Sequence, residues 1–432
     1  MNHQIKKSNL SEERLSKIKK HITKNYINTN KYIGTVTAIY KNDNIAFLDI
    51  QGMQDRERNI PLKRDSIFRI YSMTKPITSV AMMILYELGK FQIDDPVHKF
   101  IPSWKNLKVY KSGNYPNFKT TDPLSVMTIK DLLSHQSGLT YGFQMKSEVD
   151  KAYREIGIGR MESLNTNQTL SDMINTLKDV PLEFSPSTAW NYSVSTDVLG
   201  HLIEIISGKS FDEFLKENIF NKLNMKDTDF FVPKEKLDRF TANYLFNMGE
   251  PMDPSGALPL RKVDRHSIES GNPILIDDPQ MSLYHRKPSF LSGGGGLVST
   301  LDDYMNFATM LLNNGVFKDQ QILSKKTIDL MTSNHLEGNK DLFSSSHANT
   351  VSETTLAGVG FGLGFQILMN PAKNQINSSI GEYGWGGAAS TAFWIDPSEN
   401  LITIFLTQLI PSTTYNIRRE LRTLVYSSLT YK

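Results

Sequence analysis

Apolar and polar positions follow strand-like periods near both ends of the chain. Residues 32–40 and 45–51 have strand character and are separated by a polar turn over 41–44. Residues 391–395 and 401–407 form a second strand pair near the C-terminus. A helical stripe follows this pair and consists of Ile417, Leu421, Leu424 and Val425. The pattern predicts that the two ends of the chain form one lobe of sheet and helices.

The middle of the chain has a helical period instead. Polar or proline-bearing loops separate the helical segments, which are 129–133, 170–177, 198–206 and 211–223. We therefore predict an α/β (α+β) protein in which a mostly helical lobe, residues 93–291, is inserted into a discontinuous sheet lobe, residues 1–92 and 292–432. Three stretches without a clear period, about 105–122, 247–288 and 338–355, are too long for simple connections, so we expect them to shape a binding site or to be mobile.

A strand-like apolar run, residues 66–71, leads into Ser72-Met73-Thr74-Lys75, and a helical period follows it as far as Gly89. A serine hydroxyl needs a positioned base to act as a nucleophile. A spacing of three along a helix puts Lys75 one turn from Ser72 on the same face. Because Pro76 is tolerated only in the first turn of a helix, Ser72 must lie very near the helix start. The helix dipole and free N–H groups there favour a developing anion.

The same four-residue pattern occurs a second time, at Ser16-Lys17-Ile18-Lys19. This copy lies in the polar half of an N-terminal amphipathic helix, and no strand precedes it. The apolar stripe of that helix consists of Leu15, Ile18, Ile22 and Tyr26. We interpret the second copy as solvent-exposed surface.

Composition narrows the class of protein. A chain of 432 residues exceeds one ordinary single-core domain, and 39% hydrophobic residues are typical of soluble globular proteins. The absence of cysteine excludes disulfides, thiolate metal sites and a cysteine nucleophile. A net charge of +3, from 48 basic and 45 acidic residues, makes nucleic acid a poor candidate partner. The chain has neither a signal-peptide apolar region nor a run of membrane-spanning length, so we expect no membrane span and a cytoplasmic location.

Other candidate motifs fail on spacing. Gly208-Lys209-Ser210 is similar to the end of a phosphate-binding loop, but Ile203 stands where the first glycine is required, so we interpret Gly208 as a helix C-cap. The glycine-rich run 358–364 misses the dinucleotide fingerprint and is interpreted as a strand with close backbone approach. The nine histidines include no His-Glu-x-x-His pair, and we interpret His135 and His201, in predicted helical segments, as structural. We expect no metal and no cofactor.

Two further segments are candidate parts of a site that contains Ser72. Tyr192-Ser193-Val194 leads into the helix near residue 198, and Trp385-Gly386-Gly387 stands before the strand predicted from residue 391. Glycines at the beginning of a strand allow another group to approach the backbone closely.

In this order, the three segments resemble the Ser-x-x-Lys, Tyr-x-Asn and Lys-Thr-Gly motifs of the serine β-lactamase and penicillin-binding protein superfamily. Segments 131–139 and 292–297 also look like segments of that superfamily, and the match runs from about residue 33 to 406. Tryptophan followed by two glycines in the third motif is most similar to the family VIII carboxylesterases and related acyltransferases. These share the class C β-lactamase fold. The resemblance implies an antiparallel sheet flanked by helices, an inserted helical lobe, and an active site between the two lobes.

The resemblance also implies roles for individual residues. Ser72 is the expected nucleophile that forms an acyl-enzyme. Tyr192 takes its proton while Lys75 lowers the pKa of the tyrosine, or Lys75 is itself the neutral base; both alternatives stay open. The oxyanion is expected to bind the backbone N–H groups of Ser72 and Ala388. The expected substrate-binding residues are Trp385, Gly386, Gly387 and Val194.

The departures from the family pattern bear on the substrate. In the β-lactamases, the basic residue of the third motif helps to hold the carboxylate of the drug, and the asparagine of the second motif contacts its amide side chain. Trp385 and Val194 can do neither, so neutral, hydrophobic acyl groups are favoured. We predict a serine carboxylesterase for small-molecule esters with short to medium acyl chains and weak or no β-lactamase activity. The alternatives are an acyltransferase or an amide or β-lactam hydrolase on this scaffold, and a non-catalytic filament or binding protein.

Overall fold

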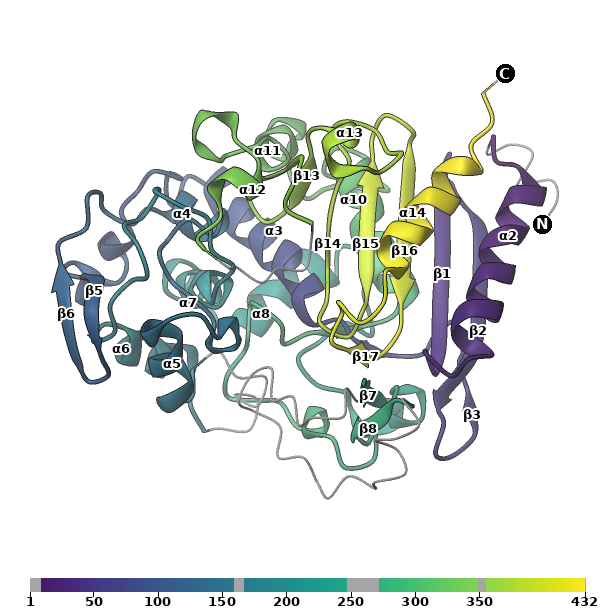
Figure 1. Ribbon diagram of the computed structural model, residues 1–432, viewed down its shortest axis with the longest axis horizontal. Helices are drawn as coiled ribbons and strands as arrows, with labels where there is room; N and C mark the ends of the chain where they lie inside the picture. Colours follow the sequence, from purple (N-terminus) through teal and green to yellow (C-terminus); the bar gives the residue numbers. More distant parts are fainter. Residues whose placement is uncertain (1–8, 159–166, 247–271, 349–354, 432) are drawn as a thin grey trace.

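An eight-stranded antiparallel sheet is the centre of one lobe (Figure 1). The computed structural model describes residues 9–158, 167–246, 272–348 and 355–431. In spatial order the strands are β12 (Val359–Phe361), β13 (Gln366–Leu368), β14 (Tyr383–Gly386), β15 (Ala392–Asp396), β16 (Leu401–Leu406), β1 (Gly34–Lys41), β2 (Asn44–Asp55) and β3 (Ile60–Pro61). N-terminal β1 pairs with C-terminal β16, with Ala38 opposite Ile404. The two ends of the chain therefore contribute neighbouring strands to one antiparallel sheet.

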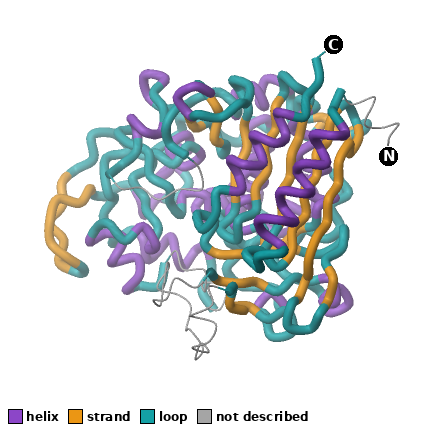
Figure 2. Tube along the Cα trace, turned by 45° about the vertical axis from the view of Figure 1, so that its right-hand side comes forward, coloured by secondary structure: helices purple, strands orange, loops and turns teal. Residues whose placement is uncertain are grey.

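Helices cover both faces of this sheet (Figures 1 and 2). The covering helices are α2 (Glu12–Ile22) and α14 (Ile417–Ser427) on one face, and α3 (Thr74–Glu87) and α10 (Leu301–Leu312) on the other. Successive side chains of a strand point to opposite faces. Trp394 and Phe405 pack with α2 and α14, whereas their neighbours Phe393 and Ile404 join the core on the α3 side. Burial on both faces explains why these strands are almost continuously apolar.

The helical lobe lies beside the sheet on the α3 side (Figure 1). Its helices are α4 (Ile129–Leu133), α5 (Glu148–Glu155), α6 (Leu170–Leu177), α7 (Ser195–Ser207) and α8 (Phe211–Leu215). α7 contacts α3, α4, α6 and α8, so it is the central helix of this lobe. The exact lobe boundaries stay a prediction; β7 (Asn243–Leu245), within the range predicted for the helical lobe, pairs with β17 (Leu409–Ile410).

The remaining elements are short. They comprise β4 (Phe68–Arg69), β8 (Ile274–Asp277), β9 (Val298–Ser299), β10 (Val316–Phe317), β11 (Gln320–Gln321), α11 (Lys325–Met331), α12 (Leu342–Ser345) and α13 (Pro371–Asn374). Within the described ranges, none of the helices combines the length and the apolar character needed to cross a bilayer.

Four local predictions differ from the structure. Residues 105–122 contain a hairpin, β5 (Val109–Asn114) and β6 (Asn117–Thr121), whose mostly exposed polar side chains leave no apolar alternation. His135 follows α4 in a left-handed turn (φ 55°) and is not helical. The α-helical part of segment 211–223 ends at Leu215, and a π-helical turn continues it. Trp385 and Gly386 precede the strand predicted from residue 391, which is β15, but they also lie within a strand that was not predicted, β14. Most of segment 247–288 lies outside the described residues.

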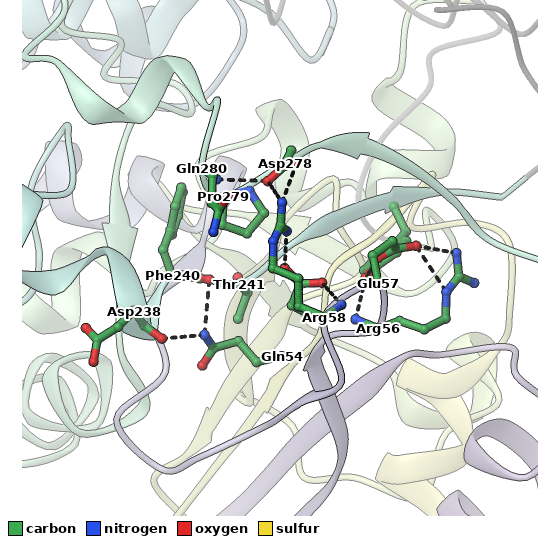
Figure 3. A network of polar contacts seen from close by, with 12 residues as sticks. Gln54, Arg56, Glu57, Arg58, Asp238, Phe240, Thr241, Asp278, Pro279 and Gln280 are labelled. Carbon is green, nitrogen blue, oxygen red and sulfur yellow. Dashed lines mark hydrogen bonds and ion pairs between the residues drawn. The ribbon is translucent and has the colours of Figure 1, made fainter.

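A polar network fixes loops from both sides of β7 against the end of β2 (Figure 3). Arg58 donates to Asp55 at 2.5 Å and to both carboxylate oxygens of Asp278 at 2.9 and 2.8 Å. Gln54 Nε2 donates to the carbonyl oxygens of Asp238 and Phe240 at 2.8 and 3.3 Å. Because residue 241 follows directly and β7 comes next, the network helps to position the strand that reaches the nucleophile segment.

Candidate active site

Ser72 lies in a short 3-10 helix, Tyr71–Met73, that leads directly into α3. Pro76 is the third residue of α3, as the sequence required. Tyr71 has a left-handed backbone (φ 43°), a conformation that costs a non-glycine residue roughly 1–2 kcal/mol. Asn243 of β7 donates a hydrogen bond to the Tyr71 hydroxyl at 2.8 Å. The sharp turn at Tyr71 is thus held from a second element, and it places Ser72 at the start of α3.

Ser72, Lys75 and Tyr192 meet in one buried cluster. The Tyr192 hydroxyl donates to Ser72 Oγ at 2.7 Å, and Lys75 Nζ is 3.4 Å from the same oxygen. Lys75 Nζ also donates to the carbonyl of Gly294 at 2.6 Å and lies 4.5 Å from the centroid of the Tyr192 ring. Only 8% of the surface of Ser72 and 2% of that of Lys75 and of Tyr192 is exposed. The structure therefore brings together three residues that lie 120 positions apart in the sequence at most.

The third motif lies beside this cluster. The Trp385 ring centroid is 5.5 Å from that of Tyr192 and 5.4 Å from that of Phe361. A Cβ on Gly387 would lie 2.4 Å from the carbonyl oxygen of Ile70, so only glycine fits against the segment that precedes Ser72. Half-buried Ala388 follows, in the turn between β14 and β15. Its placement next to Gly387 is compatible with a role in oxyanion binding, which stays a prediction.

A charged side chain from α14 braces the turn that carries Ala388. Arg418 Nη2 donates to the carbonyl oxygens of Gly387 and Thr391, each at 2.8 Å. A Cβ on Gly386 would lie 2.5 Å from Arg418 Cζ, so the glycine leaves room for the guanidinium. Val194, the other predicted binding residue, is the buried N-cap of α7, and its N–H donates to the carbonyl of Thr140.

Asp197, which was not predicted from the sequence, is a buried carboxylate next to the cluster. Asp197 lies in the first turn of α7, and its Oδ1 accepts hydrogen bonds from Ser292 Oγ at 2.6 Å and from the Gly294 N–H at 3.0 Å. Burial raises the pKa of Asp197, while the Lys75 charge and these two donors act in the opposite direction. Acidic residues are common in the first turn of a helix, so the sequence offered no signal that this one is buried.

His135, which was interpreted as structural, packs directly against the cluster. Its ring centroid is 5.1 Å from that of Tyr192, and its Nδ1 is 3.2 Å from Ser193 Oγ. Burial, and secondarily the charge of Lys75, holds the pKa of His135 well below its usual range. A neutral imidazole here packs against Tyr192 without adding charge.

A cavity of about 410 Å³ lies next to β14. Trp385 and Gly386 form one side, and Arg418, Arg419 and Arg422 of α14 form another. Ser72 and Tyr192 do not line it, but Trp385, which does, packs its ring against that of Tyr192. In the part of the chain that the structure describes, no group of three or more His, Asp or Glu side chains is placed to hold a metal ion.

The chain is similar in sequence and in fold to several known proteins. EstB of Burkholderia gladioli, an esterase, is 25% identical, with 87% of this chain and 86% of EstB covered. Protein Rv1367c of Mycobacterium tuberculosis is 29% identical, with 88% and 86% covered. Among solved structures, EstCE1, described as a hydrolase with promiscuous acyltransferase activity, superposes with a TM-score of 0.76 at 22% identity, covering 96% of this chain and 99% of that one. Since the Beta-lactamase family model matches residues 20–426, the chain belongs to the Beta-lactamase family and is a serine hydrolase.

Proposed function

We propose that the protein is a carboxylesterase that hydrolyses small esters with short to medium acyl chains through an acyl-enzyme on Ser72. The observation that carries this proposal is the 2.7 Å hydrogen bond between Tyr192 and Ser72, with Lys75 beside both. A nucleophile and a proton acceptor in contact, with a third group orienting them, are what acyl transfer needs. The similarity to EstB, which is named an esterase, supports ester substrates.

The reaction follows from the positions of these groups. Ser72 Oγ bonds to the ester carbonyl carbon, and the Ser72 proton passes to the phenolate form of Tyr192. The ammonium of Lys75, 4.5 Å from the Tyr192 ring, favours that phenolate. The tetrahedral oxyanion binds the N–H groups of Ser72 and Ala388, each worth about 2.7–4 kcal/mol in comparable sites. Tyr192 returns the proton to the departing alcohol, and water then cleaves the acyl-enzyme by the same steps in reverse.

The walls of the site favour a neutral acyl group. Trp385 and Val194 are buried and apolar, and they stand where the resemblance places a cation and an amide in the β-lactamases. Without these polar partners, the carboxylate and amide of a β-lactam lose their binding contacts. We therefore expect slow or undetectable β-lactam cleavage.

Transfer of the acyl group to an alcohol is the second candidate function. The description of EstCE1 as a hydrolase with promiscuous acyltransferase activity favours it. The acyl-enzyme is common to both reactions, and the second acceptor decides the product. Adding an alcohol and measuring the ester formed at the expense of free acid separates transfer from hydrolysis.

Hydrolysis of a series of p-nitrophenyl esters of increasing acyl length, with nitrocefin measured alongside, tests the main proposal. Ser72→Ala should abolish turnover, whereas Ser16→Ala, in the second Ser-x-x-Lys copy, should not change it. Ser16 is a matched control because its hydroxyl donates to the carbonyl of Glu13, one turn away on the same helix, at a half-exposed position of α2. Equal turnover by Ser72→Ala and the parent would refute the proposal. If a fluorophosphonate failed to label the folded parent at Ser72, a non-catalytic binding role would replace it.

A further inference from the structure

We infer that Asp197 is a positioning residue that keeps Lys75 in its ammonium form, so that Tyr192, and not Lys75, takes the proton from Ser72. The first half of this inference concerns the charge state of Lys75 alone. The second half rests on the proposed function.

Asp197 and Lys75 both bind the backbone of Gly294, Asp197 at its N–H and Lys75 at its carbonyl oxygen. The Gly294 N–H donates to Asp197 Oδ1 at 3.0 Å, and the Gly294 carbonyl accepts from Lys75 Nζ at 2.6 Å. Thr78, one turn along α3 from Lys75, donates to the carbonyl of Gly293 at 2.8 Å. The turn that contains Gly293 and Gly294 is therefore held to α3 on one side and to α7 on the other. These contacts fix Lys75 relative to Asp197.

Glycine is required in this turn for space. A Cβ on Gly294 would lie 2.7 Å from Asp197 Oδ2 and 2.7 Å from the hydroxyl oxygen of Tyr141. Because Gly294 has no side chain, the carboxylate of Asp197 can approach the peptide that binds Lys75. The short path between the two charges is thus built into the fold.

The other side chains described around Lys75 are a serine, two tyrosines and a histidine. Ser72 precedes it on the same helical turn, and the rings of Tyr192 and Tyr141 lie 4.5 and 5.2 Å from its Nζ. His135, whose pKa is held well below its usual range by burial, is neutral. Asp197 supplies a carboxylate, and the Ser292 hydroxyl and the Gly294 N–H stabilise its charge.

A buried ammonium is costly unless an opposite charge lies near it. The Asp197 carboxylate and the Gly294 carbonyl meet this need, so proton loss from Lys75 is disfavoured. An ammonium cannot accept a proton, whereas its charge stabilises the phenolate of Tyr192. The arrangement therefore assigns the base role to Tyr192 and an electrostatic role to Lys75.

Titration of Lys75 by NMR tests the charge state without any need for turnover. Protein labelled with ¹³C at lysine Cε is titrated, and Lys75→Arg identifies the Lys75 signal. In the parent, the signal should report ammonium at about pH 8, where a buried lysine without a counter-charge would be neutral. In Asp197→Asn, which keeps an oxygen acceptor and removes the charge, the midpoint should fall by about one pH unit or more.

Asp303→Asn is the matched control for this titration. Asp303 is also a buried carboxylate with a raised pKa, but it accepts from Asp227 and Thr228. The midpoint of Lys75 should be the same in Asp303→Asn and in the parent. An unchanged midpoint in Asp197→Asn, or a neutral Lys75 at about pH 8 in the parent, would overturn the inference. Even if Asp197→Asn does not fold, the parent measurement keeps the inference refutable, because a neutral Lys75 contradicts it.

The pH dependence of kcat/KM for p-nitrophenyl butyrate tests the second half. If Lys75 must be an ammonium, Asp197→Asn moves the alkaline limb of the profile to lower pH. If neutral Lys75 were the base, the same change would instead move the acidic limb to lower pH and raise activity there, which would overturn the assignment of Tyr192. A parent without Ser72-dependent turnover would refute the proposed esterase function, while the NMR titration would still decide the role of Asp197.

Discussion

Replacement of Arg418 should reduce the turnover number, although Arg418 is distant from Ser72 in the sequence. Its guanidinium donates to the carbonyls of Gly387 and Thr391, which flank the turn that carries Ala388. In Arg418→Met both hydrogen bonds are lost, and the turn can shift away from the position that suits an oxyanion. The expected effect is therefore on kcat, with a smaller change in KM, because the oxyanion exists only after attack.

The structure bounds the size of this effect. Complete loss of one oxyanion donor costs about 2.7–4 kcal/mol, or roughly 100- to 1000-fold in kcat. Two backbone hydrogen bonds, from Gly387 N–H to Thr391 at 2.9 Å and from Ser390 N–H to Gly387 at 3.0 Å, still close the turn in the variant. We therefore expect partial displacement and a fall of about tenfold, or about 1.4 kcal/mol. Because Arg418 is half-buried and water can replace part of its hydrogen bonding, the free energy of unfolding should fall by only about 1–2 kcal/mol.

Gly386→Ala perturbs the same contact from the other side. Its new Cβ would lie 2.5 Å from Arg418 Cζ, and the backbone of Gly386 is not left-handed, so displacement of Arg418 is the main consequence. In the parent, Gly386→Ala should lower kcat; in Arg418→Met, whose flexible side chain can move aside, it should do little. The assay is kcat and KM for p-nitrophenyl butyrate in the parent, the two single variants and the double variant, with urea unfolding of each.

Additive effects in this cycle would refute the bracing role, because they would show that the two residues act independently. A kcat for Arg418→Met within about twofold of the parent would refute it as well, since twofold is far below the bound for an oxyanion donor. Arg418→Lys is the control for charge alone. One nitrogen, Nη2, donates to both carbonyl oxygens, and the shorter lysine keeps the charge without the planar guanidinium that places this nitrogen between them, so its kcat should lie between those of Arg418→Met and the parent.

Three further predictions concern single residues. Tyr192→Phe removes the hydroxyl that contacts Ser72 and should lower kcat by about 10²- to 10⁴-fold in the ester assay; an unchanged kcat would exclude proton transfer by Tyr192. Trp385→Ala should cost about 3–5 kcal/mol in urea unfolding, because the ring is 2% exposed, and should shift the ester preference toward longer acyl chains; an unchanged preference would show that the ring does not limit acyl length. Burial raises the pKa of Asp303 to about 6, so its contribution to stability is present below about pH 4 and is lost as pH rises through 6. The free energy of unfolding of the parent should fall by up to about 3 kcal/mol over that range from this group. The same loss in Asp303→Asn would contradict this cause.

The fold could be predicted where burial requires a run of neighbouring apolar residues. Strands β1, β15 and β16 are covered on both faces, so they appear as apolar runs whose pairing follows from short turns. Most side chains of the β5–β6 hairpin are exposed, so its sequence contains no apolar run that would predict the strands. The short strand β7 is placed by contacts with β17 and by the polar network around Gln54, which are distant in the sequence, and so it could not be predicted.

The site divides in the same way. Ser72 and Lys75 are one helical turn apart, so their proximity follows from spacing. Tyr192 and Trp385 were predicted because the order of three motifs is specific to a family. Asp197 and Arg418 reach the site through the backbone of Gly294 and Gly387, and a hydrogen bond to a backbone atom constrains no residue type on the other side. Such contacts leave no pattern in a single sequence.

The two Ser-x-x-Lys copies show what tertiary structure adds to a local motif. Ser16 and Lys19 lie on α2 at the spacing of Ser72 and Lys75, but Lys19 is exposed and Ser16 is half-exposed. Two charges 4 Å apart interact by about 1 kcal/mol in water and by about 4 kcal/mol at the effective dielectric of a protein site. An exposed ammonium therefore stabilises a neighbouring anion by too little to activate a hydroxyl. Lys75 is buried, and Gly294 links it to Asp197 through hydrogen bonds, so the same four-residue spacing there meets the low dielectric that the proposed electrostatic role of Lys75 needs.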